Sequence, residues 1–120
     1  MLPCIFDHIQ DLRANGHHVT VKVRGMAASM GGILLQAGDM RCVGPEALVL
    51  IHAVSSGAIG EVNQMEDRVA FTKLLWEKLS KILAKRSSMT AEQIREKAYK
   101  FDWWLEAEEA VKLGFADAIS

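Results

Sequence analysis

The first half of the chain changes between the spacing of helices and that of strands. Apolar residues recur every three or four positions over residues 5–12, which predicts a helix, and Gly16 is typical of its end. Valines alternate with polar residues over 18–24, which predicts a half-buried strand. Short apolar segments at 30–37 and 47–52 predict a buried helix and a strand covered on both faces.

One long helical pattern dominates the second half. Apolar residues keep a spacing of three to four over residues 61–85, which predicts a rod about 38 Å long. Part of so long a helix is expected to project from a small domain. Thr90 begins a further helix, with Gln93 three residues later as the partner of a capping box. The remaining predicted elements are strands at 40–43 and 116–119 and helices that end near residues 99 and 113.

Strands that alternate with helices favour an α/β fold in which crossover helices connect parallel strands. The sequence contains no internal repeat or interdomain linker, so we expect residues 1–120 to form a single domain. The chain opens on a helix, whereas a parallel sheet normally begins with strands. We therefore expect an N-terminal part of the fold to be absent from this chain.

Composition and charge argue against several classes of function. The chain has 14 Lys and Arg against 15 Asp and Glu, a balance that favours neither nucleic acid nor a membrane surface as partner. No apolar run is long enough to span a bilayer, and the first residues do not follow the pattern of a signal peptide, so we expect a cytoplasmic protein. Cys4 and Cys42 are too few for a disulfide framework, and no Cys/His spacing predicts a metal site.

Ser29 is the first candidate for chemistry. It lies in Gly-Met-Ala-Ala-Ser-Met-Gly-Gly at residues 25–32, where the predicted strand gives way to a helix. The free N–H groups at a helix start favour an oxyanion, so the Met30 N–H is placed to stabilise a tetrahedral intermediate. The simpler interpretation is an N-cap serine among small packing residues.

His52 and Asp102 are the other two candidates. His52 ends the apolar strand, at the edge of an α/β sheet where ligands usually bind, and its imidazole suits a general base. Asp102 lies between two predicted helices beside three aromatic residues, which we expect to shield its carboxylate partly. Such a carboxylate can orient an imidazole. The alternatives are a structural histidine at the sheet rim and a capping or turn aspartate.

Three segments together resemble the Clp protease proteolytic subunit. They are the segment around Ser29, residues 49–52 (Val-Leu-Ile-His), and residues 101–117, which begin Phe-Asp-Trp-Trp. They follow the family's order of serine, histidine and aspartate, and a long helix separates the last two. The resemblance implies a Clp protease/crotonase-like fold with parallel strands, crossover helices and a projecting handle helix. It covers nearly the whole chain.

The resemblance also implies a role for each residue. Ser29 becomes the nucleophile, His52 the general base and then acid, and Asp102 the orienting carboxylate. Met30 supplies one oxyanion N–H, whereas the glycine-rich turn that supplies the other in the family is absent here. The loop from Ser55 to Gly60 is expected to line the substrate cleft and the contact between rings of the assembled protein. The residues expected to do so are Ser55, Gly57, Ile59 and Gly60.

The family resemblance implies polypeptide substrates, no cofactor and no metal. It implies a homo-oligomer built from heptameric rings and fed by an ATP-driven unfoldase. The Val-Arg-Gly-Met-Ala-Ala-Ser motif is also similar to phage head-maturation proteases of the Clp type, whose partners would be capsid or scaffold proteins.

Three alternatives stay open from the sequence. One is a catalytically incompetent piece or an assembly domain that lacks part of the oxyanion hole. An acyl-CoA hydratase-like enzyme shares the fold but uses no Ser-His-Asp set. A Ser-Lys dyad would need Lys22 or Lys73, and His52 with Asp102 at the family positions argues against it.

Overall fold

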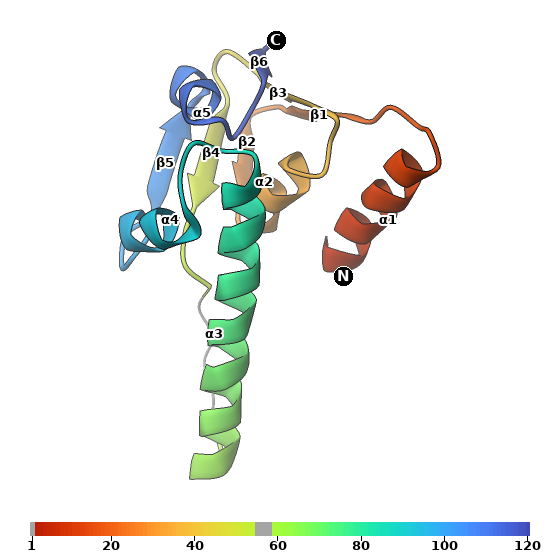
Figure 1. Ribbon diagram of the computed structural model, residues 1–120. Coiled ribbons are helices and arrows are strands. Elements are labelled where there is room, and N and C mark those ends of the chain that lie inside the picture. Colours follow the sequence, from red (N-terminus) through yellow and green to blue (C-terminus); the bar gives the residue numbers. More distant parts are fainter. Residues whose placement is uncertain (1, 55–58) are drawn as a thin grey trace.

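The computed structural model describes residues 2–54 and 59–120 (Figure 1). Strands and helices alternate along these residues, as predicted for an α/β fold. The helices are α1 (Leu2–Ala14), α2 (Met30–Leu35), α3 (Val62–Lys85), α4 (Ala91–Lys97) and α5 (Ala107–Leu113). The strands are β1 (Thr20–Val23), β2 (Met26–Ala28), β3 (Met40–Val43), β4 (Leu48–Ile51), β5 (Trp103–Glu106) and β6 (Ala118–Ile119).

Two three-stranded sheets form within the described residues. The first has the order β1-β3-β6, and all its strands are parallel. The second has the order β2-β4-β5, in which β2 runs parallel to β4 and β5 runs antiparallel to it. The parallel strands with crossover helices are therefore confirmed, whereas the antiparallel β5 and the division into two sheets were not predicted.

The buried core lies where the second sheet meets α2, α5 and the C-terminal half of α3. Phe115 is completely buried at its centre, and its ring packs edge-to-face on Trp103 at a centroid distance of 5.8 Å. Val49 and Leu105 are opposite each other on β4 and β5 and are equally buried. These apolar contacts hold β4 firmly, and β4 leads directly to His52.

Helix α3 projects from this core, as predicted (Figure 1). Its C-terminal half is anchored by Leu79 and Leu83, which are buried. Its N-terminal half extends away from the core, and Val62 and Val69 there are 71% and 51% exposed. Apolar side chains on an exposed helix face are typical of a surface that another protein covers.

Two strands escaped the sequence prediction, and both lie in the second sheet. Strand β2 consists of Met26, Ala27 and Ala28, which have little intrinsic preference for strands. Strand β5 occupies a segment that we expected to be a turn between two helices. Both form because β4 pairs with them on either side, a tertiary contact that no local pattern reports.

Candidate active site

Ser29 lies on a sharp turn between β2 and α2. Its backbone has φ 54° and ψ −118°, a conformation that favours glycine and strains a residue with a side chain. A serine on a strained strand-to-helix turn has its hydroxyl exposed above the sheet, as in the nucleophile elbow of hydrolases. Its side chain makes no capping hydrogen bond to α2. Ser29 therefore occupies the N-cap position of α2, but its hydroxyl does not cap the helix.

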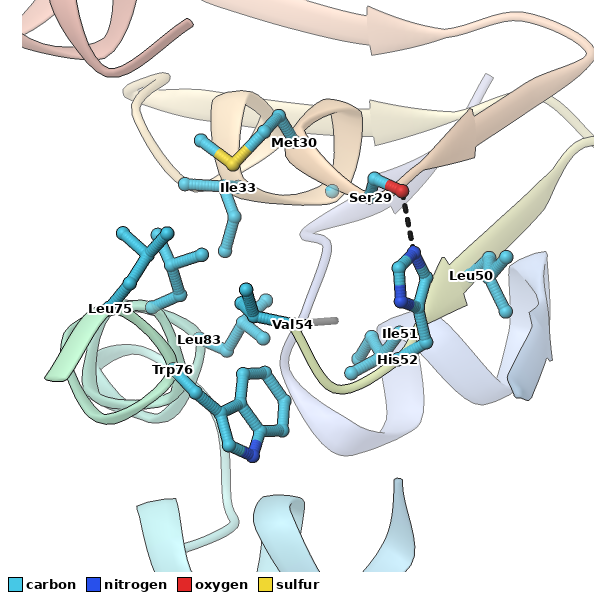
Figure 2. Close-up of a pocket in the computed structure, with 12 residues that line it drawn as sticks. Ser29, Met30, Ile33, Leu50, Ile51, His52, Val54, Leu75, Trp76 and Leu83 are labelled. Atoms are coloured by element: carbon cyan, nitrogen blue, oxygen red, sulfur yellow. Dashed lines mark hydrogen bonds between the residues drawn. The ribbon is translucent and has the colours of Figure 1, made fainter. Parts of the chain in front are cut away.

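The hydroxyl of Ser29 lies 2.5 Å from Nε2 of His52, and Figure 2 shows the two side chains pointing toward each other. Strand β2 runs parallel to β4, with Ala28 level with Leu50. Both strands therefore end at the same edge of the sheet, and the residues that follow them meet there. The sheet thus brings together two residues that are 23 positions apart in the sequence.

The other ring nitrogen of His52 defines the tautomer of its neutral form. Nδ1 lies 2.8 Å from the backbone oxygen of Ala53. A carbonyl oxygen can only accept a hydrogen bond, so Nδ1 carries the hydrogen and Nε2 has the free lone pair. Nε2 can therefore accept the Ser29 hydroxyl proton, which is what a general base must do.

Asp102 is not joined to His52 in this structure. It lies between α4 and β5 rather than between two helices, and it is exposed rather than shielded. Both expectations about its surroundings are therefore wrong. Within residues 2–54 and 59–120, no hydrogen bond or ion pair to its carboxylate is present. The nearby aromatic residues Phe101 and Trp104 are themselves largely exposed, so they exclude little water.

An apolar cavity of about 230 Å³ opens beside Ser29 and His52. Helix α2 forms one wall with Met30 and Ile33, and α3 forms the other with Leu75 and Trp76 (Figure 2). Sequence analysis missed the α3 side of this cavity. The spacing of Leu75 and Leu79 is that of any helix face that packs on a core, so the pattern alone does not distinguish a cavity wall from a packed interface.

Of the other predicted cleft residues, the two that the structure describes, Ile59 and Gly60, do not line this cavity. Ser55 and Gly57 lie outside the described residues. Ile59 is fully exposed, and Gly60 has φ 153° just before α3. The cleft role assigned to this loop therefore stays a prediction.

The alternatives that involve other groups find no support. Ser29 bonds to His52, whereas Lys22 and Lys73 are exposed and neither lines the cavity at Ser29.

Among the described residues, no group of three or more His, Cys, Asp or Glu side chains is arranged to hold a metal ion. In the same part of the chain, no helix is both long and apolar enough to cross a membrane.

Comparison with known proteins identifies a family for this chain. The family model described as Clp protease matches residues 2–120. Over 103 residues the chain is 40% identical to the ATP-dependent Clp protease proteolytic subunit 2 of Tropheryma whipplei, which is 84% of this chain and 56% of that protein. Over 101 residues it is 40% identical to the ATP-dependent Clp protease proteolytic subunit of Streptococcus mutans, which is 81% of this chain and 51% of that protein.

The chain thus spans about half the length of the curated relatives it matches. The family match nevertheless extends over almost every residue, including the turn at Ser29 and the strand that ends at His52. On that match, this chain belongs to the Clp protease family.

Proposed function

We propose that this chain carries the nucleophile and the general base of a serine endopeptidase. The observation that carries the proposal is the contact between the Ser29 hydroxyl and Nε2 of His52, made from a strained turn at the mouth of a cavity. A serine hydroxyl is a weak nucleophile until an adjacent base accepts its proton. His52 is within hydrogen-bond reach and has the tautomer required.

The proposed reaction proceeds in two halves. Ser29 Oγ attacks the carbonyl carbon of the peptide bond while its proton moves to Nε2 of His52, and the Met30 N–H donates to the oxyanion. The C–N bond then breaks as His52 returns the proton to the leaving amine, which leaves an acyl-enzyme on Ser29. Water, deprotonated by His52, attacks that ester, and Ser29 recovers its proton when the ester bond breaks.

Asp102 is proposed as the third member of the set. To act in this way, its carboxylate would accept from Nδ1 of His52 in place of the Ala53 oxygen, and it would stabilise the imidazolium that forms during attack. The family resemblance supports this role, and the exposed position of Asp102 leaves its side chain free to rotate.

The cavity favours substrates with an apolar side chain next to the cleaved bond. Its walls are almost entirely hydrocarbon, and Leu50, Val54 and Leu83 complete them. A substrate side chain placed there would exchange water for apolar contacts, a gain of about 25 cal/mol for each Å² buried. Polypeptides are therefore the proposed substrates.

Self-assembly is proposed from the family resemblance and from the surface of α3. Val62, Met65, Val69 and Leu74 are exposed on its projecting half. Contacts through this half, with the loop around Ser55 to Gly60, would join copies in rings. An ATP-dependent unfoldase, or capsid and scaffold proteins in a phage-type role, would deliver the substrate, and the proposed location is the cytoplasm.

Replacement of the nucleophile tests the peptidase proposal. Ser29→Ala should abolish hydrolysis of peptides and covalent labelling by a fluorophosphonate probe, because losses of about 10⁶-fold in kcat accompany removal of such a serine. Ser120→Ala, which changes an exposed serine far from the cavity, should leave both unchanged. Undiminished peptidase activity in Ser29→Ala would refute the proposal.

A second candidate is an assembly domain without turnover, favoured by the bond of His52 Nδ1 to Ala53 rather than to Asp102. The same assay separates the two. Labelling of Ser29 without turnover of any peptide would support the assembly domain, and turnover would exclude it.

A further inference from the structure

The turn that follows α2 is held by a guanidinium from another helix. Arg86, the C-cap residue of α3, donates to the backbone oxygens of Gln36, Gly38 and Asp39 at 3.3, 2.5 and 3.1 Å. These carbonyls lie at and beyond the end of α2, where a helix leaves acceptors without partners of its own. One side chain of α3 therefore satisfies three acceptors of the segment that ends α2.

Arg86 belongs to a larger cluster of arginines and carboxylates. Arg41 is 4% exposed and forms an ion pair with Asp117 at 2.8 Å, and Asp117 also lies 3.5 Å from Arg86. Burial, together with the positive charge of Arg41, lowers the pKa of Arg86. Arg13 donates to Ala37 and to the Asp39 carboxylate from α1. Asp117 thus pairs with Arg86, and Arg13 bonds to the same turn that Arg86 contacts.

Direct packing between α2 and α3 is interrupted by the apolar cavity. Met30 and Ile33 on α2 line it opposite Leu75 and Trp76 on α3 (Figure 2). Apolar side chains on opposite sides of a space have few contacts that fix the distance between them. Beside the cavity, the separation of the two helices therefore depends on the core contacts of Leu79 and Leu83 and on the bonds by which Arg86 joins the end of α3 to the turn after α2.

We propose that Arg86 is a positioning residue that sets the width of the cavity and, through it, the size of the apolar side chain accepted beside Ser29. This inference rests on the peptidase function proposed above. Arg86 acts at the end of α2 opposite to Ser29, and Ser29 is held independently by the pairing of β2 with β4. Loss of Arg86 should therefore affect the fit of the substrate more than the chemical step.

The chemistry of the contact requires arginine. A guanidinium presents several N–H groups in a rigid plane, whereas an ammonium is a compact point donor on a flexible stem. A lysine at position 86 would keep the charge but not the simultaneous bonds to three carbonyls. Arg86→Lys should therefore resemble Arg86→Gln in direction, with a smaller effect.

The experiment compares Arg86→Gln and Arg86→Lys with Lys85→Gln. Lys85 is the adjacent residue, is exposed and, in the described part of the chain, donates no hydrogen bond to α2. Peptides that differ only in the apolar residue before the cleaved bond (Ala, Leu, Phe, Trp) are compared by kcat and KM. In Arg86→Gln, KM for the preferred peptide should rise and kcat should hold. The ratio of kcat/KM for the preferred peptide to kcat/KM for the poorest peptide should fall by about tenfold. That change is at the lower end of the discrimination that a hydrophobic pocket achieves.

A readout without catalysis keeps this proposal separate from the peptidase proposal. Butanol and benzyl alcohol are titrated into each variant while the NMR signals of the Met30 and Ile33 methyl groups are followed. Arg86→Gln should change the ratio of the two affinities, and Lys85→Gln should not. If the ratio changes in a protein that cleaves no peptide, the result would support the role of Arg86 in setting the width of the cavity and would refute the peptidase function. Unchanged size preference in folded Arg86→Gln, by peptides or by alcohols, would overturn the role of Arg86. If Arg86→Gln does not fold, Arg86→Lys decides by the same criteria.

Discussion

Ile51 on β4 pairs with Trp103 on β5, and this pair is the last in the antiparallel ladder. One residue beyond it lie His52 on one chain segment and Asp102 on the other. Opposite residues in an antiparallel ladder lie about 5 Å apart at Cα and direct their side chains to the same face. His52 and Asp102 therefore each adjoin this pair in the sequence, although the Asp102 carboxylate makes no bond to the imidazole in the described structure.

This relationship leads to a prediction for Asp102→Asn. If the carboxylate turns onto Nδ1 of His52 during the reaction, the substitution should lower kcat by about 10⁴-fold, the loss known when the same change is made in a serine-protease triad. The rates are compared with those of Asp11→Asn, which alters an exposed carboxylate on α1. Equal rates in the two variants would mean that the Ala53 carbonyl alone orients His52.

The strained backbone of Ser29 predicts that glycine at this position makes the folded protein more stable than alanine does. Ser29→Gly should be more stable to unfolding than Ser29→Ala by about 1 kcal/mol, because glycine adopts φ 54° without the strain that a Cβ imposes. Urea unfolding curves of both variants measure the difference. An equal or lower midpoint for Ser29→Gly would show that the turn at Ser29 stores no strain.

The carboxylate of Asp117 predicts how stability depends on pH. Hydrogen bonds from Arg41 lower the pKa of Asp117 from its ordinary value of 3.8, and a backbone hydrogen bond from Val19 does the same for Asp39. In the unfolded chain these carboxyls take up protons at higher pH than in the folded one. Their contribution to stability is therefore present above about pH 4 and is lost as the pH falls through the lowered values.

Urea midpoints at pH 6 and pH 3 test this expectation. Asp117→Asn should be destabilised at pH 6 by about 2 kcal/mol, because it removes the carboxylate that pairs with the buried Arg41. It should also lose less stability than the unsubstituted protein between the two pH values. Glu108→Gln, an exposed carboxylate on α5, serves as the control. A pH dependence identical in Asp117→Asn and the control would contradict the assignment.

The projecting half of α3 predicts an effect on assembly alone. Val69→Glu should shift the protein to smaller species in sedimentation experiments, because it places a charge in an apolar surface that assembly would bury. Circular dichroism should show an unchanged helix content, since residue 69 makes no contribution to the buried core. Glu66→Gln on the same exposed turn should leave the sedimentation profile as it was.

Much of the local structure could be predicted because it depends on neighbours in the sequence. The capping box of Thr90 and Gln93 forms as its spacing indicates, with hydrogen bonds in both directions. Helix α5 ends at Leu113, where a helix end was predicted, and Gly114 follows it as a left-handed cap. The end of the long helix near Lys85 was also correct. Each of these features involves residues a few positions apart, so a pattern in the sequence reports it directly.

The candidate site was predicted only in part. The choice of Ser29 and His52 came from motif order, and the structure places their side chains in contact. The partial shielding of Asp102 was predicted from its aromatic neighbours and is wrong, because Phe101 and Trp104 are exposed and Trp103 packs on Phe115 instead. The wall that Leu75 and Trp76 give to the cavity was not foreseen.

The sequence by itself determined the helices and four of the strands, the family and the residues suited to acid–base chemistry, since these depend on residue type and spacing. Tertiary structure alone decided which strands pair with β4, which way the imidazole of His52 is oriented, and how α2 and α3 enclose a cavity. Those features depend on contacts between residues tens of positions apart, such as Arg86 with Gly38. Their free energy comes from packing and hydrogen bonds that exist only once the chain has folded.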